Sequence, residues 1–99
     1  MKRRSPPKRR ARKLTQIEIE AVLMKLGELI QELRKQDFPN AEDFAYEIEI
    51  SRSNMNRHEK GKDMLVSTLL KIIAGLDKTP QEFFALIEKK VNPKKGQKA

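Results

Sequence analysis

Residues 41–64 read AEDFAYEIEISRSNMNRHEKGKDM, which is the pattern of two short helices joined by a tight turn. Asn40 is a good N-cap for the first helix, and Ser51 is one for the second, over residues 52–60. About three residues remain between the two helices, which is the spacing of a helix-turn-helix. The sequence therefore predicts a helix-turn-helix over residues 41–60.

The apolar residues of this segment fit a core shared by the two helices. They are Phe44, Ala45, Ile48, Ile50 and Met55. Ala45 is small enough to let the two helix backbones approach, and the first helix ends near Ile48. Gly61 follows the second helix and can adopt the left-handed conformation that commonly ends a helix.

The outward face of the second helix carries no acid, and every side chain on it can donate hydrogen bonds. Its members are Arg52, Ser53, Asn56, Arg57 and Lys60. An arginine can bridge O6 and N7 of guanine in the DNA major groove, and an asparagine can pair with N6 and N7 of adenine. The plainer interpretation is a solvated polar helix face.

A longer helix is predicted upstream of this segment. Thr15 and Glu18 have the spacing of a capping box, and the helix that they open runs to about Lys35. Its apolar stripe consists of Leu23, Leu26, Ile30 and Leu33. Gly27 near this stripe indicates that a neighbouring helix comes close. A short strand over residues 17–20 is the alternative for the alternating start.

Two more helices are predicted downstream. The first covers residues 66–76, and its start is ambiguous between Asp63 and Ser67. Its broad apolar face consists of Leu69, Leu70, Ile72, Ile73 and Leu76. The second is opened by Thr79, Pro80 and Glu82 and runs to about Lys90. This last helix is expected to bury Phe83, Leu86 and Ile87, with Phe84 on its flank. We therefore predict an all-α, five-helix domain over residues 14–91.

Basic charge is concentrated outside this domain. The chain has 99 residues, 22 Lys and Arg, 14 Asp and Glu, and a formal net charge of +8. Residues 1–13 contain eight basic residues and no acid, so a disordered basic arm is expected there. Residues 92–99 read as a second flexible basic tail. After the arm, residues 14–50 carry a balance of −6, and residues 51–99, which include this tail, carry one of +6.

Several classes of protein do not fit this composition. The chain has no cysteine and a single histidine, His58, so metal and redox cofactors are not expected. The longest apolar stretch, residues 69–76, is far shorter than the roughly 20 residues of a membrane span. Carboxylates are plentiful but lack a nearby nucleophile, metal site or phosphate loop, so no enzymatic activity and no small-molecule substrate are expected.

Residues 26–84 resemble the lambda-repressor-like helix-turn-helix family, also called XRE or Cro/cI-type. The similarity lies in LGELIQELR, in DFA and ISRSNMNRHEKGK, and in STLLKIIAGL. It implies that the helix over residues 52–60, which is the third of the five predicted helices, enters the major groove of DNA. Carried over by position, the DNA-binding residues are Asn40, Ala41, Arg52, Ser53, Asn54, Asn56, Arg57, Lys60 and Lys62. It also implies a partly buried ion pair between Arg34 and Glu59 that orients the third helix.

Within that set the resemblance assigns different tasks. Arg52, Ser53 and Arg57 match base-reading positions, with Asn56 beside them. Asn40 and Ala41 match the helix start that grips phosphate, and Lys60 and Lys62 match the loop that follows the DNA backbone. Three positions depart from the family pattern.

The first departure is Ala41, where the family commonly has Gln, so only backbone amides and Asn40 remain for that phosphate contact. The second is Glu49, where the tight turn usually has Gly. Glu49 would cost about 1 kcal/mol if it must be left-handed. The third is His58, which stands where an apolar or aromatic residue is usual, and a half-buried structural role is expected for it.

The function expected from these features is sequence-specific binding of double-stranded DNA by a bacterial, cytoplasmic, nucleoid-associated transcription regulator that forms a dimer. The alternative is a protein-interaction module, such as an antitoxin or transcription coactivator, with nonspecific DNA affinity from the arm. RNA binding is a weaker third possibility. The arm could contact DNA, act as a targeting signal or only solubilise the chain. Ile17, Ile19 and Val22 could cover the domain's flank or form a dimer contact, as could an exposed Phe84.

Overall fold

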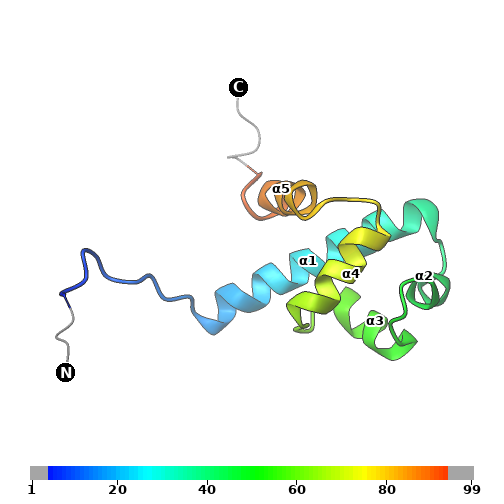
Figure 1. Ribbon diagram of the computed structural model, residues 1–99, viewed down its shortest axis with the longest axis horizontal. Coiled ribbons are helices and arrows are strands. Elements are labelled where there is room, and N and C mark those ends of the chain that lie inside the picture. Colours follow the sequence, from blue (N-terminus) through cyan, green and yellow to red (C-terminus); the bar gives the residue numbers. More distant parts are fainter. Residues whose placement is uncertain (1–4, 94–99) are drawn as a thin grey trace.

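A computed structural model describes residues 5–93, and these residues form helices and no strand. The helices are α1 (Gln16–Asp37), α2 (Ala41–Glu47), α3 (Arg52–Glu59), α4 (Val66–Gly75) and α5 (Pro80–Val91). The all-α prediction is confirmed for this part of the chain (Figure 1). The strand considered for residues 17–20 is wrong, because α1 continues through them.

Four of the five helices begin at a side-chain cap. The side chains of Thr15 and Thr79 each accept a hydrogen bond from the backbone amide of the glutamate three residues later. The side chain of that glutamate accepts one from the backbone amide of the threonine, so both predicted capping boxes are present. Asn40 and Ser51 cap α2 and α3. Helix α4 has no side-chain cap, and it begins after Leu65. Local sequence signals therefore place most of the helix starts.

The hydrogen bonds of the two capping boxes change the pKa of the glutamates that accept them. The Thr15 backbone amide donates to Glu18 Oε1 at 2.8 Å, and the Thr79 amide donates to Glu82 Oε1 at 2.9 Å. Because these bonds favour the ionised carboxylates, they lower the pKa of Glu18 and of Glu82.

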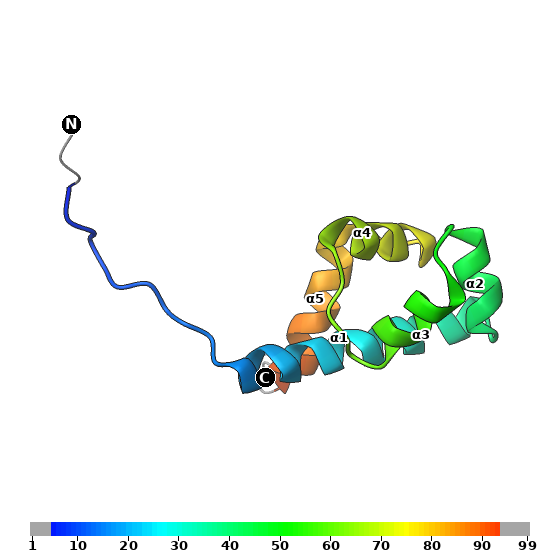
Figure 2. The ribbon, with the colours of Figure 1, turned by 90° about the horizontal axis from the view of Figure 1, so that it is seen from below.

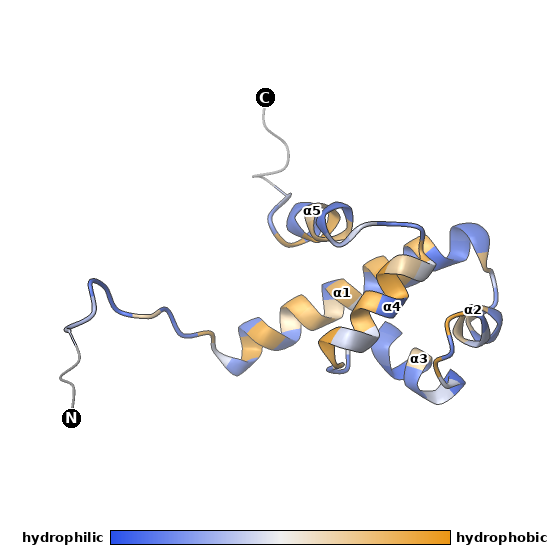
Figure 3. Ribbon diagram, viewed as in Figure 1, coloured by the Kyte–Doolittle hydropathy of each residue, from blue (hydrophilic) through white to orange (hydrophobic). Residues whose placement is uncertain are grey.

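The core lies between α1, α2, α4 and α5, with one contribution from α3. Its completely buried large side chains are Ile30, Phe44, Met55, Ile72, Ile73 and Phe83. Figure 3 shows that α4 is apolar along most of its length, whereas α3 is mostly polar. Ile48, Ile50 and Leu86, expected in the core, pack against it while only partly buried.

Several large apolar residues are exposed, and the sequence analysis addressed two of those in the last two helices. Leu70 was expected inside it, but 45% of its surface is exposed. Leu69, Ile72 and Ile73 form the stripe that packs inward, and Leu70 lies about 100° around the helix from Leu69. Phe84 is 46% exposed, as its place on the flank of α5 predicted.

Helix α1 packs against α2, α3 and α5. Lys90 fixes α5 to α1 through Glu32 at 3.0 Å and Glu28 at 3.6 Å. Figure 2 shows α2 and α3 grouped toward the carboxyl end of α1, while α4 lies on the opposite side of the bundle from α1. The first turns of α1 protrude, and Ile17 is 78% exposed.

Gly27 marks the closest approach of α1 and α3. A Cβ atom at this position would lie 2.6 Å from the Glu59 carbonyl oxygen and 2.7 Å from that of His58. Both distances are too short for any side chain. The prediction that a neighbouring helix comes close to Gly27 is confirmed, and that neighbour is α3.

Residues 5–15, which precede α1, contain no helix and lead away from the bundle (Figures 1 and 2). Flexibility was predicted for residues 1–13 and 92–99; residues 1–4 and 94–99 lie outside the described residues. Within residues 5–93, no helix combines the length and the apolar character that crossing a membrane requires.

Candidate nucleic-acid interface

The turn between α2 and α3 aims the second helix. Residues 48–51 connect the two helices, and the Ile50 amide donates to the Ala45 carbonyl oxygen at 2.9 Å. Glu49 has φ of 61°, so the turn places a non-glycine residue in the left-handed region, at a cost of about 1 kcal/mol. Ala45 is 1% exposed at this junction. Helices α2 and α3 pack against each other, and Ala45 is buried in the core that they share.

Arg34 fastens the other end of α3 to the bundle. Its Nη2 donates to Glu59 Oε1 and its Nε to Glu59 Oε2, both at 2.9 Å. Its Nη1 donates to the carbonyl oxygens of Phe38 at 3.0 Å and Pro39 at 2.7 Å. The side chains of Arg34 and Glu59 are 4% and 7% exposed, so the expected ion pair is present and is nearly fully buried.

With its inner side held in this way, α3 turns one polar face outward. Met55 and His58 are the buried residues of α3. The exposed residues of α3 and of the loop after it include Arg52, Ser53, Asn54, Asn56, Arg57, Lys60 and Lys62. The structure thus gathers seven of the predicted site residues on one helix and the loop that follows it.

The start of α2 supplies the other two predicted residues. Asn40 is exposed, and its side-chain Oδ1 accepts the Glu42 amide at 2.8 Å. Ala41 is partly buried beside it. Glu42 and Asp43 place two negative charges in the same first turn. This corner therefore offers phosphate a polar amide and backbone dipoles, but it also repels phosphate through two carboxylates.

Glu42 contacts Arg52 on α3, and the sequence analysis did not predict this contact. The outward side of α3 has no acid of its own, but Glu42 Oε2 from α2 lies 3.5 Å from Arg52 Nη1. Both side chains are more than half exposed. The only available signal was that Glu42 follows a predicted N-cap. Which residue of α3 it would meet depends on how the two helices cross.

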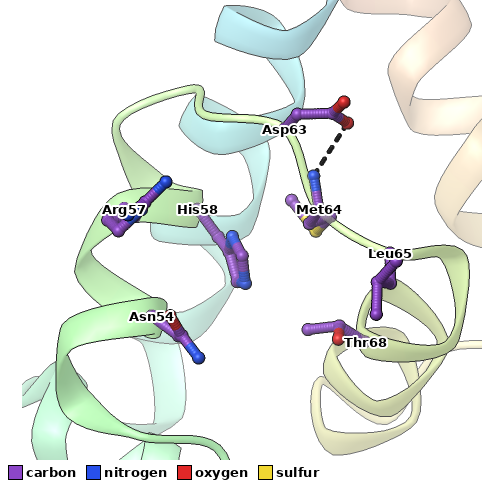
Figure 4. A pocket seen from close by; sticks show the side chains of 7 residues that line it. All are labelled: Asn54, Arg57, His58, Asp63, Met64, Leu65 and Thr68. Carbon is purple, nitrogen blue, oxygen red and sulfur yellow. Dashed lines mark hydrogen bonds between the residues drawn. The ribbon is translucent and has the colours of Figure 1, made fainter.

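An open hollow of about 400 Å³ separates α3 from the start of α4. Figure 4 shows Asn54, Arg57 and His58 on the α3 side, with Leu65 and Thr68 across from them. The Asp63 carboxylate accepts the Met64 amide at 2.8 Å and shapes the loop between the helices. Two of the predicted site residues, Asn54 and Arg57, thus form one wall of a notch beside the polar face.

His58 points between α3 and α4 and is 7% exposed, more buried than the half-buried position expected (Figure 4). Its Nδ1 atom is buried without a hydrogen-bond partner. Burial lowers the pKa of the imidazole, and the positive charge of Arg57 lowers it further. The ring therefore favours the neutral state inside the bundle.

Comparison of the chain with protein-family models, with curated proteins and with solved structures gives no match. The candidate site combines a short turn between α2 and α3, a buried ion pair behind α3, and an outward face of hydrogen-bond donors.

Proposed function

We propose that this chain is a sequence-specific double-stranded DNA-binding transcription regulator with a lambda-repressor-like helix-turn-helix fold, and that α3 reads the major groove. The observation that carries the proposal is the two-sided character of α3. Its inner side is held by Met55, His58 and Glu59, while its outward side exposes arginine, asparagine and serine. Reading base edges requires such donors on a helix held in a fixed orientation.

The exposed residues divide into two tasks under this proposal. Arg52, Ser53, Asn56 and Arg57 read base edges, with Asn54 at the border of the hollow. Phosphate contacts come from Asn40, from the backbone amide of Ala41, and from Lys60 and Lys62 in the loop after α3. Phosphate contacts position the protein, whereas base contacts supply sequence preference.

The basic arm adds to affinity without adding sequence preference. Residues 1–13 carry eight of the 22 Lys and Arg residues of the chain. Each cation that neutralises a phosphate releases a counterion, so binding through the arm weakens steeply as salt rises. This division lets the folded domain select a site while the arm holds the duplex.

A homodimer on a two-fold related DNA site completes the proposal. Two copies of α3 would then lie about 34 Å apart, one turn of the duplex. Ile17 and Phe84 are exposed apolar residues available for such a contact. The resemblance to this family favours a bacterial, nucleoid-associated location in the cytoplasm.

A protein-interaction module, such as an antitoxin or a transcription coactivator, is the second candidate. It is favoured by Glu42 and Asp43, whose charge repels phosphate at the start of α2, and by Tyr46, which is 82% exposed. In that case the arm alone would bind DNA, and mutations in α3 would leave the affinity unchanged.

Selection of bound duplexes from a random pool, at about 0.15 M salt, tests the proposal. The full chain is compared with Arg57→Ala and with Lys62→Ala. Arg57→Ala should relax the preference at one base pair by about 1 to 3 kcal/mol. Lys62→Ala should instead weaken binding to all sequences and reduce the salt dependence by about one unit of slope. Enrichment of no motif by the full chain would favour the second candidate.

A further inference from the structure

Two opposite charges meet where the first turn of α2 faces the first turn of α3. Arg52 Nη1 lies 3.5 Å from Glu42 Oε2, with the two side chains 69% and 57% exposed. The backbone of Glu42 is fixed, because its amide donates to Asn40 Oδ1 at 2.8 Å. The side chain therefore starts from an anchored backbone, and its carboxylate lies beside Arg52 on the outward face of α3.

The contact orients the Arg52 guanidinium but leaves most of its N–H donors available to a ligand. A charge-assisted hydrogen bond between a guanidinium and a carboxylate is about 2.7 to 2.9 Å long, so 3.5 Å is a looser ion pair. A guanidinium has five N–H donors, and only Nη1 is directed at Glu42. The remaining donors can still bridge O6 and N7 of a guanine.

Glu42 also affects which group on DNA Arg52 can approach. A phosphate oxygen that binds Arg52 would carry its charge close to the Glu42 carboxylate, and the two negative charges would repel each other. The edge of a base is uncharged and meets much less repulsion. The carboxylate thus disfavours a phosphate contact more than a base contact.

Arg57 provides the internal contrast. It is exposed on the same helix, but within residues 5–93 it forms no ion pair with an acid. Arg57 therefore lacks the bias against phosphate that a neighbouring carboxylate would impose. Of the two arginines on the outward face, Arg52 alone stands beside a carboxylate.

We propose that Glu42 is a positioning residue for base reading, which reserves the Arg52 guanidinium for a guanine in the major groove and opposes its use as a phosphate contact. This inference rests on the proposed function. Glu42 lowers affinity for DNA in general and raises discrimination at one base pair. A repulsive element that improves specificity at the expense of affinity is a recognised way to discriminate among ligands.

The test uses the full chain and compares Glu42→Gln with a matched control, Asp43→Asn. Each variant removes one negative charge from an exposed residue in the first turn of α2, and only Glu42 forms an ion pair with Arg52. Selection from a random pool gives the base preference, and fluorescence anisotropy with the selected and an unrelated duplex gives affinity. Circular dichroism verifies that both variants keep the helical fold.

Glu42→Gln should reduce the preference for guanine at one base pair by about tenfold while strengthening binding to the unrelated duplex. Asp43→Asn should strengthen binding to both duplexes and leave the preference unchanged. In an Arg52→Ala background, Glu42→Gln should no longer alter the preference, because the residue that it positions is absent.

Three results would overturn the inference. If both charge-removing variants raise affinity alike and keep the wild-type motif, Glu42 only repels DNA, while the proposed function stands. If Glu42→Gln still changes the preference in the Arg52→Ala background, Glu42 contacts a base directly. If the wild-type chain selects no motif, the proposed function fails and the role of Glu42 fails with it.

Discussion

The molecule contains two arginine–glutamate pairs on α3 that differ in almost everything except their chemistry. Arg34 and Glu59 are nearly fully buried and share two hydrogen bonds of 2.9 Å. Arg52 and Glu42 are exposed and stand 3.5 Å apart. One pair lies behind α3 and the other at its front, so burial separates a pair that fixes the helix from one that remains available to a ligand.

The physical origin of this difference is the cost of removing charge from water. A buried pair stabilises the fold only if its geometry is good and its remaining donors are satisfied. Arg34 meets this condition because Nη1 donates to the Phe38 and Pro39 carbonyl oxygens. The exposed pair has little desolvation to offset and gains little from its attraction, since water and salt screen it.

The largest expected effect comes from breaking the buried pair. Glu59→Gln leaves the Arg34 guanidinium buried without a counter-charge, and the free energy of unfolding should fall by about 3 to 5 kcal/mol. Urea denaturation followed by circular dichroism measures this. The double variant Arg34→Met with Glu59→Leu serves as the control, and it should recover much of the loss. A loss below about 1 kcal/mol would show that this buried pair contributes no more to stability than an exposed ion pair does.

Gly27→Ala should have the next largest effect, since it pushes α3 and its buried glutamate away from α1. The added Cβ would lie 2.6 Å from the Glu59 carbonyl oxygen, so we expect a loss of about 1 to 3 kcal/mol. The same urea experiment measures it. Gln36→Ala, an exposed change on the same helix, should stay within about 0.5 kcal/mol. Equal stability of the two variants would contradict the close approach.

An intermediate effect on the free energy of unfolding is expected from pH, through the titration of His58 on the buried side of α3. The pKa of His58 is lowered in the folded state, so between pH 7.5 and about 5.5 the unfolded chain binds more protons. The free energy of unfolding should therefore fall as pH drops below about 6.5. Glu18 and Glu82, whose pKa values are also lowered, add a further loss only below about pH 4.5.

The variant His58→Leu isolates this contribution. Its stability should change less between pH 7.5 and 5.5 than that of the wild type, because the titrating imidazole is gone. Thermal unfolding at a series of pH values is the measurement. Identical pH profiles for the two proteins would show that His58 does not titrate against folding.

The smallest effect on stability belongs to the exposed pair. A double-mutant cycle with Arg52→Met and Glu42→Gln should give a coupling of at most about 1 kcal/mol, and 1 M salt should remove most of it. The same cycle on Arg34 and Glu59 should give a larger coupling that changes little with salt. If the two couplings were equal, burial would not be what distinguishes the pairs.

How far the sequence predicted this structure depends on the range of each interaction. The caps Thr15, Asn40, Ser51 and Thr79 act on amides two or three residues away, so their local patterns were sufficient. Gly27 near the apolar stripe also predicted that another helix packs closely there. The sequence did not show that this helix is α3, because the contact joins residues far apart in the chain.

The candidate site was predicted in part for the same reason. The exposed face of α3 follows from helical spacing, and the Arg34–Glu59 pair was expected only through resemblance to a family. The contact between Glu42 and Arg52 depends on how α2 and α3 cross, which no local pattern specifies. Leu70 was misplaced because composition shows that α4 is apolar but not how wide its buried stripe is.

The four hydrogen bonds of Arg34 have a consequence for how the domain opens. An isolated helix as short as α3, with eight residues, is not stable in water, so it persists only while it is packed on the bundle. Through Arg34, the end of α3 is joined to α1 and to the loop before α2. The hydrogen-bonded amides near the end of α3 should therefore exchange with solvent deuterium mainly when the bundle unfolds, and more slowly than the amides of Arg52 and Ser53 in its exposed first turn.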